Sequence, residues 1–160
     1  YGQTKLDGEL AMQQINPANS IIIRTSWVYS KFGNNFVKTM LRLAETRDQI
    51  SVVADQIGTP TNAADLAKAI LMVLPQIENK TPEIYHYSNE GVCSWYDFAK
   101  TIFELEELHI KTAPIESSQY PKPAKRPFYS LMNKSLIKAT YGIEILYWKD
   151  SLVSCFRKIS

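Results

Sequence analysis

Cysteine, glycine and long apolar runs are all scarce in this sequence, and each shortage excludes a class of protein. The two cysteines, Cys93 and Cys155, are too few for a disulfide framework and lack metal-ligand spacing, so no metal site is expected. The six glycines never form a G-x-x-G-x-x-G turn, the motif that holds a dinucleotide pyrophosphate. Apolar runs such as 70–74 are far too short to cross a bilayer, so no membrane partner is expected.

Charge of one sign is not in excess either. The 18 basic and 16 acidic residues are interleaved and leave a net charge of +2, which gives no clustered basic face for nucleic acid. The hydrophobic share of 45% and the charged share of 21% are typical of a globular protein with a core. The opening residues have no export-signal pattern, so a cytoplasmic location is expected.

Helical and strand patterns alternate along the chain, which predicts an α/β fold. The isoleucines at 21–23 form a run that is apolar on both faces, as in a buried parallel strand. Only the strands at 20–28 and 83–88 are convincing, and two strands do not make a stable open sheet. Because the pattern opens inside a helix at Tyr1, we expect a truncated fragment whose parent sheet continues upstream. The expected helices are 1–15, 36–47, 62–74, 95–108, 134–140 and 148–158, and the expected strands are 20–28, 50–54, 83–88 and 110–115.

Capping residues and one long loop add detail to this pattern. Thr61 or Asn62 is placed to cap the helix that follows, and Ser94 with Asp97 three residues later is a capping-box pattern. Residues 117–127 form a loop rich in proline, serine and lysine that is longer than a connector needs. Long ordered loops more often bind ligands than connect elements, so this loop is a candidate for binding.

Tyr1 and Lys5 are four residues apart on the first predicted helix and therefore share one of its faces. A tyrosine phenol has a pKa of about 10 and is a poor proton donor at neutral pH. A nearby ammonium group stabilises the phenolate and lowers this pKa, which makes the phenol useful as a general acid or base. The pattern Tyr-x-x-x-Lys is common by chance, and alone it fits an ordinary surface helix better than a catalytic one.

Four blocks of sequence, in a fixed order, are far more specific than the tyrosine–lysine pair. The blocks are YGQTKLDGE at 1–9, RTSWVY at 24–29 followed by GNNF at 33–36, ADQIGTPT at 54–61, and Arg126-Pro127 with Ser130 and Asn133. Together these blocks resemble the dTDP-4-dehydrorhamnose reductase family of the extended short-chain dehydrogenases. The resemblance covers essentially the whole chain.

The resemblance implies an NADPH- or NADH-dependent oxidoreductase of polysaccharide synthesis that acts on a small-molecule nucleotide sugar and makes dTDP-L-rhamnose. In such an enzyme Tyr1 protonates the oxygen at carbon 4 of a 4-keto-6-deoxyhexose while the cofactor delivers hydride to that carbon. Lys5 holds the nicotinamide ribose and lowers the tyrosine pKa, and Thr25 and Ser26 line the nicotinamide side. The implied substrate-binding residues are Trp27, Asn34, Asn35, Gln56 and Arg126, of which the arginine suits the diphosphate.

The substrate residues also have structural explanations. Trp27 is as easily a core aromatic as a stacking wall for the sugar. Asn34 and Asn35 can simply supply the backbone conformation of a turn, and for one of them this explanation is the better one. Gln56 can be a turn residue as well, whereas Arg126, in a loop with three prolines, is harder to explain by packing.

The resemblance further implies a division of the chain. Residues 1–32 and 62–89 are expected to form the C-terminal part of a Rossmann-type dinucleotide-binding domain with a doubly wound parallel sheet. Residues 33–61 and 90–160 are expected to form a small α/β substrate-binding domain. We expect the fragment alone to be inactive, because it lacks the glycine-rich cofactor loop and the residue that polarises the carbonyl. An unpaired sheet edge is expected to produce a homo-oligomer induced by truncation.

Two other functions stay open. One is a non-catalytic relative that resembles the regulatory β subunit of methionine adenosyltransferase, which retains the tyrosine–lysine helix and acts as a binding partner. The other is a different extended short-chain enzyme, such as a sugar epimerase, in which this strand usually ends in an Asn-Val-Tyr-Gly-type segment. The segments at 24–27 and 55–58 favour the reductase. The epimerase is disfavoured because Trp27 stands before Val28-Tyr29 in this sequence.

Overall fold

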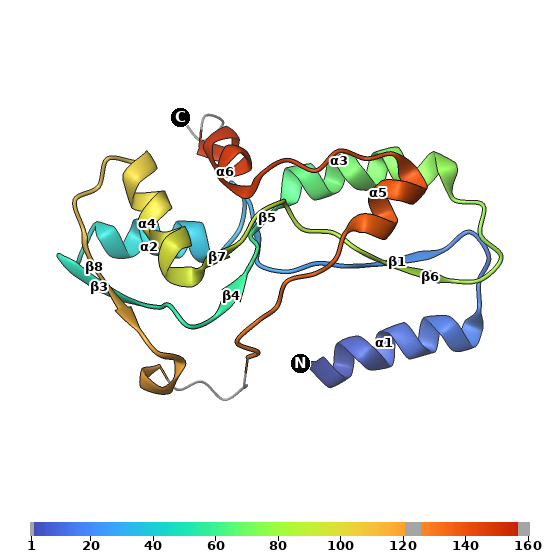
Figure 1. Cartoon of the computed structure of the whole chain (residues 1–160), viewed down its shortest axis with the longest axis horizontal. Coiled ribbons are helices and arrows are strands. Elements are labelled where there is room, and N and C mark those ends of the chain that lie inside the picture. The colour runs from blue at the N-terminus through green and yellow to red at the C-terminus, as the bar shows by residue number, and fades with distance from the viewer. Residues whose placement is uncertain (1, 121–125, 157–160) are drawn as a thin grey trace.

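Helices and short strand pairs alternate in the computed structural model, which describes residues 2–120 and 126–156 and is elongated (Figure 1). Most elements match the expected ranges and end a few residues earlier, and the expected helix end at 157–158 lies outside the described residues. The helices are α1 Gly2–Ile15, α2 Phe36–Ala44, α3 Ala63–Val73, α4 Trp95–Leu105, α5 Ser135–Tyr141 and α6 Trp148–Phe156, with 3-10 turns η1 Leu74–Gln76 and η2 Ser117–Gln119. The strands are β1 Ile21–Arg24, β2 Val28–Tyr29, β3 Gln49–Val53, β4 Ile57–Gly58, β5 Thr61–Asn62, β6 Glu83–His86, β7 Cys93–Ser94 and β8 Lys111–Ile115.

The apolar strand β1 pairs in parallel with β6 along its whole length. The sequence predicted that this strand continues to Val28, and that part of the prediction is wrong. Trp27 has a φ of 50°, in the left-handed region, and this conformation interrupts the extended backbone that ends at Arg24. The chain then resumes as β2, which pairs in parallel with β5.

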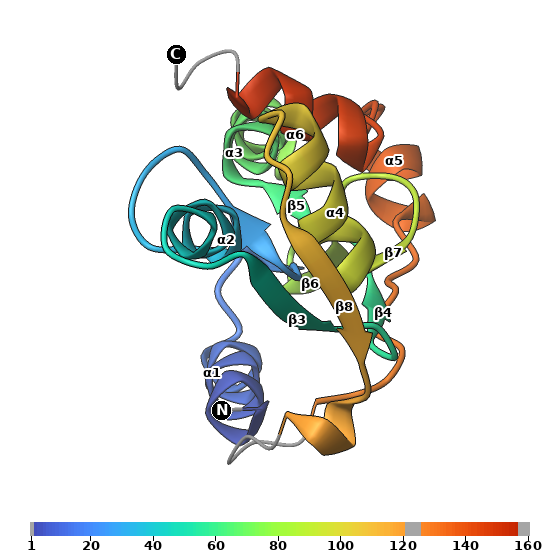
Figure 2. The ribbon, with the colours of Figure 1, turned by 90° about the vertical axis from the view of Figure 1, so that its left-hand side faces the viewer.

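A second parallel pair, β3 with β8, was not expected from the sequence. Its five residue pairs run in register along both strands. Only Ile50 and Val52 of β3 are buried, while β8 has no buried residue and contains Pro114. Such strands lack the continuous apolar run that marks a buried parallel strand, so the pattern did not reveal their pairing. Figure 2 looks onto this end of the molecule, where α2 and α4 pack beside the pair.

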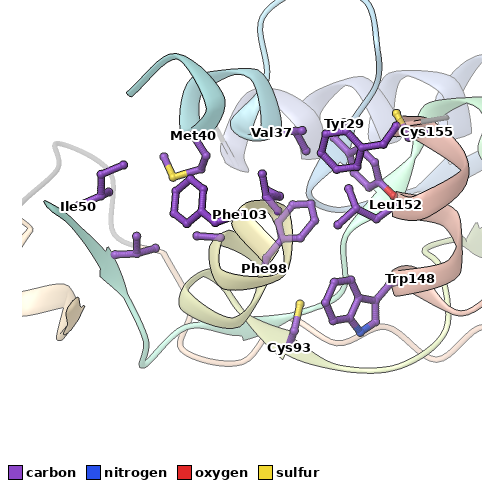
Figure 3. Packing of buried hydrophobic residues seen from close by; sticks show 14 residues of the cluster. Tyr29, Val37, Met40, Ile50, Cys93, Phe98, Phe103, Trp148, Leu152 and Cys155 are labelled. Carbon is purple, nitrogen blue, oxygen red and sulfur yellow. The ribbon is translucent and has the colours of Figure 1, made fainter. Parts of the chain in front are cut away.

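Two hydrophobic clusters stabilise the fold. The first lies around the β1–β6 pair, α3 and α5, and the second lies around α2, α4, α6 and β3 (Figure 3). The division of the chain into two domains stays a prediction; α5, which it places in the substrate-binding part, packs in the first cluster. The first cluster buries Ala69, Val73, Tyr85, Tyr87, Ile137, Tyr141 and Ile143, and the second includes Tyr29, Val37, Met40, Ile50, Phe98, Ile102, Phe103, Trp148 and Leu152.

The capping signals in the sequence mark the starts of two helices. Asn62 caps α3, because its Oδ1 accepts a hydrogen bond from the Ala64 N–H at 2.9 Å. Ser94 and Asp97 form the predicted capping box of α4, with the Ser94 Oγ accepting from the Asp97 N–H at 3.0 Å and the Asp97 carboxylate accepting from the Ser94 N–H at 2.9 Å. Each cap therefore fixes a helix start directly after a short strand, β5 or β7.

A buried polar network around Asn89 connects α3 and α6 to the end of β6. The Asn89 side chain is fully buried, and its Oδ1 accepts from the Asn62 N–H at 2.8 Å. Its Nδ2 donates to the Asp65 carboxylate at 2.9 Å and to the Ser151 hydroxyl at 2.8 Å. The Asn62 amide closes the network by donating to the Ser151 carbonyl at 3.0 Å.

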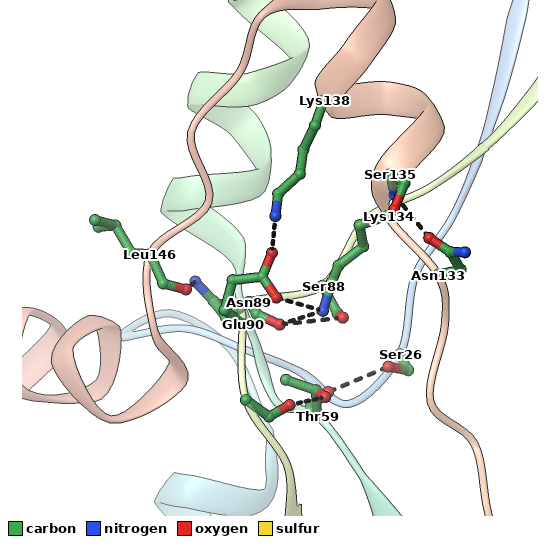
Figure 4. A network of polar contacts seen from close by, with 11 residues as sticks. Ser26, Thr59, Ser88, Asn89, Glu90, Asn133, Lys134, Ser135, Lys138 and Leu146 are labelled. Carbon is green, nitrogen blue, oxygen red and sulfur yellow. Dashed lines mark hydrogen bonds and ion pairs between the residues drawn. The ribbon is translucent and has the colours of Figure 1, made fainter.

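Charged side chains attach α5 beside this network (Figure 4). Lys134 Nζ donates to the Asn89 carbonyl at 3.1 Å and lies 3.2 Å from one Glu90 carboxylate oxygen, and Lys138 Nζ lies 2.5 Å from the other. Burial raises the pKa of Glu90, but its hydrogen bonds with Lys138 and Lys134 outweigh that effect and leave the pKa below its ordinary value. The Glu90 carboxylate therefore stays ionised and holds the start of α5.

Replacing Asn89 by alanine is expected to lower the free energy of unfolding by about 2–4 kcal/mol, because it leaves several buried polar groups without partners. Urea unfolding followed by circular dichroism measures the change. Asn34→Ala, at an exposed turn position, is the matched control and should change stability by less than about 0.5 kcal/mol. Equal losses in the two variants would contradict this role of Asn89.

Candidate functional site

Segments from distant parts of the chain meet where β1 ends. Thr25 and Ser26 directly follow β1, at the carboxyl end of a parallel strand, where sheets of this kind bind ligands. Thr25 Oγ1 donates to Thr61 Oγ1 at 3.4 Å. Ser26 Oγ donates to the Thr59 carbonyl at 3.1 Å, as Figure 4 shows. These contacts attach the end of β1 to β5 and to the segment that precedes it.

The segment after residue 126 joins the same region through backbone hydrogen bonds with β4. The Ile57 N–H donates to the Phe128 carbonyl at 2.7 Å, and the Ser130 N–H donates to the Ile57 carbonyl at 2.9 Å. Arg126 stands two residues before Phe128, and its side chain is exposed. The pairing therefore brings the Arg126 segment to Gln56, the residue before Ile57.

Trp27 lies at the centre of this region and is half-buried. Its ring stacks on Trp95, with 3.7 Å between the ring centroids and 14° between the ring planes. Gly58 packs against the Trp27 ring, since a β-carbon at Gly58 would lie 2.7 Å from indole Cε2 and Cζ2 and 2.8 Å from the Ser130 hydroxyl. A larger residue at position 58 would displace the Trp27 ring or the Ser130 hydroxyl. Trp27 also packs against the second cluster, and its role as a wall for a sugar stays a prediction.

The two asparagines before α2 have different surroundings. Asn35 is the N-cap of α2: its Oδ1 accepts from the Lys38 N–H at 3.2 Å, and its Nδ2 donates to the Ser30 carbonyl at 2.7 Å. The Asn35 amide thus serves the turn. Asn34 is exposed and presents its side chain at the surface. Substrate binding by either residue stays a prediction.

Gln56 contacts the turn that opens the long loop. Its Nε2 donates to the Ser117 hydroxyl at 2.8 Å, and that hydroxyl donates to Asp55 Oδ1 at 2.6 Å. The Ser117 N–H also donates to both Asp55 carboxylate oxygens, at 3.0 and 2.9 Å. These hydrogen bonds with Ser117 lower the pKa of Asp55. A cavity of about 430 Å³ opens beside them and is lined by Ala54, Asp55, Pro114, Ile115, Glu116 and Gln119.

Asp55 and Ser117 were not among the site residues predicted from the sequence. Each lies two residues beyond the end of its strand, and Val53 of β3 is opposite Ile115 of β8. Because the two strands are parallel and in register, the residues just beyond their ends meet. The local signal is a carboxylate and a hydroxyl residue at equal distances after two strands, but it is informative only once the pairing is known.

Lowering the pH is expected to weaken the attachment of the Ser117 turn. The folded-state pKa of Asp55 lies below its unfolded value, so the stabilisation is fully present above the unfolded pKa and is lost as the pH falls through the folded one. Urea unfolding over an acidic pH series should show a smaller loss of stability in Asp55→Asn than in the unchanged chain, because Glu9 and Glu90, whose pKa values are also lowered, still contribute to it. The control Asp48→Asn, at an exposed position away from Ser117, should keep the pH dependence of the unchanged chain.

Helix α1 carries Lys5 on its exposed surface and is attached to β1 by an ion pair. Arg24 Nε and Nη2 donate to the two carboxylate oxygens of Glu9 at 2.9 and 2.5 Å, a bidentate geometry. The hydrogen bond with Arg24 lowers the pKa of Glu9. In Figures 1 and 2 the N-terminal end of α1 lies on the same side of the molecule as the segment that follows residue 126. Tyr1 lies outside the described residues.

A larger hollow of about 520 Å³ lies at the end of α4 remote from Trp95. It is lined by Lys100, Phe103, Glu104, Glu107, Leu108, His109, Ile110 and Thr112. None of the predicted site residues lines it.

Within residues 2–120 and 126–156, no group of three His, Cys, Asp or Glu side chains is arranged to hold a metal ion. The same residues include no helix with the length and apolar character needed to span a membrane.

Comparison with known proteins gives the family. Residues 1–160 match the family described as RmlD substrate binding domain. The chain belongs to this family. The RmlD-family chain is 42% identical over 159 residues to a dTDP-4-dehydrorhamnose reductase of Sinorhizobium fredii, with 94% of this chain and 53% of that protein covered. It is 41% identical over 152 residues to the spore coat polysaccharide biosynthesis protein SpsK of Bacillus subtilis, with 95% of this chain and 52% of that protein covered.

Solved structures of RmlD-type reductases agree with this fold. A dTDP-4-dehydrorhamnose reductase from Clostridium acetobutylicum matches with a TM-score of 0.92 and 42% identity, over 99% of this chain and 55% of that chain. The Bacillus anthracis reductase, solved in complex with NADP, matches with a TM-score of 0.89 and 38% identity, over 100% of this chain and 55% of that chain. The RmlD-family chain therefore spans about half the length of these relatives. The predicted family and the predicted Rossmann-type α/β fold class are confirmed.

Proposed function

We propose that the full-length protein containing these residues is an NADPH-dependent oxidoreductase that converts dTDP-4-dehydrorhamnose to dTDP-L-rhamnose. The observation that carries the proposal is the match of the whole chain to the RmlD family, at 42% identity to a reductase of that name. The name of the Bacillus subtilis relative supports a place in polysaccharide synthesis. A cytoplasmic location belongs to the same proposal.

Tyr1 and Lys5 form the acid–base pair of this proposal. When NADPH is bound, it supplies the hydride that reduces carbon 4 of the sugar. Tyr1 donates its phenolic proton to the oxygen on that carbon, and Lys5 lowers the pKa of the phenol so that the transfer is rapid near neutral pH. The ion pair between Glu9 and Arg24 supports this assignment, because it fixes helix α1, which carries Lys5, to the end of β1.

Thr25 and Ser26 suit the nicotinamide side of the cofactor. Both hydroxyls lie at the carboxyl end of β1, and hydrogen bonds to Thr61 and Thr59 orient them. A hydroxyl that donates to the protein keeps lone pairs that accept from a ligand donor, such as a carboxamide N–H. The sequence has no G-x-x-G-x-x-G turn for the pyrophosphate, so Thr25 and Ser26 are assigned only to the nicotinamide end of the cofactor. NADH stays an alternative to NADPH.

The nucleotide sugar is assigned to the surface around Trp27. The Gln56 amide donates to Ser117, so its oxygen is oriented to accept from a sugar hydroxyl. Arg126 is exposed and cationic, and its planar fork matches a diphosphate. Asn34 supplies a second surface amide, while Asn35 acts through the turn that it caps.

An assay of the full-length protein with NADPH and dTDP-4-dehydrorhamnose tests the proposal. We expect NADPH to be oxidised in equal amount to the dTDP-L-rhamnose formed, as separated by chromatography. A sugar epimerase would isomerise a nucleotide sugar without net consumption of NADPH. A non-catalytic relative would bind without turnover. Either of these results overturns the proposal.

A further inference from the structure

Trp95, the first residue of α4, contacts the aromatic side chains of two candidate substrate segments. Its ring stacks on Trp27 at 3.7 Å and 14°, and it lies tilted against Phe36 at 4.6 Å and 48°. Phe36 directly follows Asn35, the N-cap of α2. One indole therefore touches both the chain that leaves β1 and the start of α2.

The backbone of Trp95 is itself fixed from two sides. The capping box of Ser94 and Asp97 orders the first turn of α4. The strand β7 that ends at Ser94 pairs antiparallel with β4, with Ser94 opposite Ile57. The segment that carries Gln56 is thus joined to Trp95 by a strand pair. Trp95 stands where three candidate substrate segments meet.

Trp27 needs support of this kind because its backbone conformation is strained. A φ of 50° is disfavoured for a bulky residue other than glycine. Such conformations persist where the surrounding structure over-determines them, and they cluster at ligand sites. Trp95 stacks on the Trp27 ring, and Gly58 packs closely against it. We propose that Trp95 is a positioning residue for the substrate subsite, which holds Trp27 ready for the sugar; this inference rests on the proposed function.

Replacing Trp95 by leucine in the full-length protein is expected to raise the KM for the dTDP-sugar about five- to tenfold. Without the stacked indole, the Trp27 ring would become ordered only when the sugar binds. The free energy needed for this ordering weakens sugar binding and leaves the reacting groups unchanged. The turnover number should change much less, and the KM for NADPH should not change. Trp95→Phe keeps an aromatic ring and should shift the same KM in the same direction by a smaller factor. This variant also gives the test if the leucine variant fails to fold.

Trp148 provides the matched control. It is buried in the same cluster and meets Phe98 edge-on, at 5.8 Å and 87°, without being part of the Trp27–Trp95 stack. Trp148→Phe should lower the melting temperature and leave both KM values unchanged. Two stacked indoles also produce an exciton couplet in far-ultraviolet circular dichroism. Both Trp95 variants should lose this couplet, whereas Trp148→Phe should keep it.

The outcomes separate this inference from the proposed function. A Trp95 variant that loses the couplet but keeps the original KM for the dTDP-sugar overturns the positioning role. A rise of the KM for NADPH by the same factor, or a loss of stability alone, also overturns it, because both point to general damage. No turnover by the unchanged protein would instead overturn the proposed function, and this inference with it.

Discussion

Replacing Tyr1 by phenylalanine is expected to lower the turnover number of the full-length protein by about 10²–10⁴-fold. Phenylalanine keeps the ring but has no hydroxyl to protonate the oxygen on carbon 4 of the sugar. The lost interaction exists only in the transition state, so the KM for the dTDP-sugar should stay near its original value. Steady-state oxidation of NADPH measures both constants.

A second tyrosine shows whether this loss is specific. Tyr147 is exposed at 45%, lies just before α6 and is not among the predicted site residues, so Tyr147→Phe removes a comparable tyrosine hydroxyl outside that set. This variant should keep the original turnover number. If Tyr1→Phe also kept it, Tyr1 would not be the proton donor. If its defect were confined to a higher KM, the residue would bind substrate without catalysing the reaction.

Much of the fold follows from local sequence. The triple isoleucine at 21–23 is apolar on both faces, and β1 pairs in parallel as that pattern indicates. Asn62, Ser94 and Asp97 satisfy the first N–H groups of their helices through contacts within three residues, so their signals are readable without tertiary information. The interruption at Trp27 was not readable, because nothing local distinguishes a left-handed tryptophan from an extended one.

In the candidate site, too, the residues could be predicted from local sequence and the contacts between distant residues could not. Its predicted catalytic and binding residues lie in continuous blocks, such as the segment from Thr25 to Trp27, and a resemblance identifies such blocks directly. The contacts that orient these blocks join residues far apart in the chain. Asp55 and Ser117 are 62 residues apart, and they meet only because β3 and β8 pair in register. The half-exposed pattern of those strands does not specify a partner, so the contact could not be predicted.

Replacing Arg126 by alanine is expected to raise the KM for the dTDP-sugar by about 10–100-fold and to lower the turnover number only modestly. The charge of the diphosphate changes little between the ground state and the transition state. A contact with it therefore contributes mainly uniform binding. Arg126→Lys should recover part of the loss, because it restores the charge but not the planar fork. Steady-state kinetics with varied dTDP-sugar measure these effects.

The competing explanation is that Arg126 only holds its loop in place. Under that explanation, alanine would lower the melting temperature and leave the KM of the remaining folded enzyme unchanged. The structure favours the ligand role, because the backbone hydrogen bonds of Ile57 with Phe128 and Ser130 already hold this segment, and the exposed Arg126 side chain is not needed for them. Lys149→Ala, which removes an exposed cation on α6, is the control for charge alone and should leave the KM unchanged. Melting temperature and KM measured on the same Arg126→Ala protein distinguish the two explanations, and an unchanged KM would rule out the diphosphate contact.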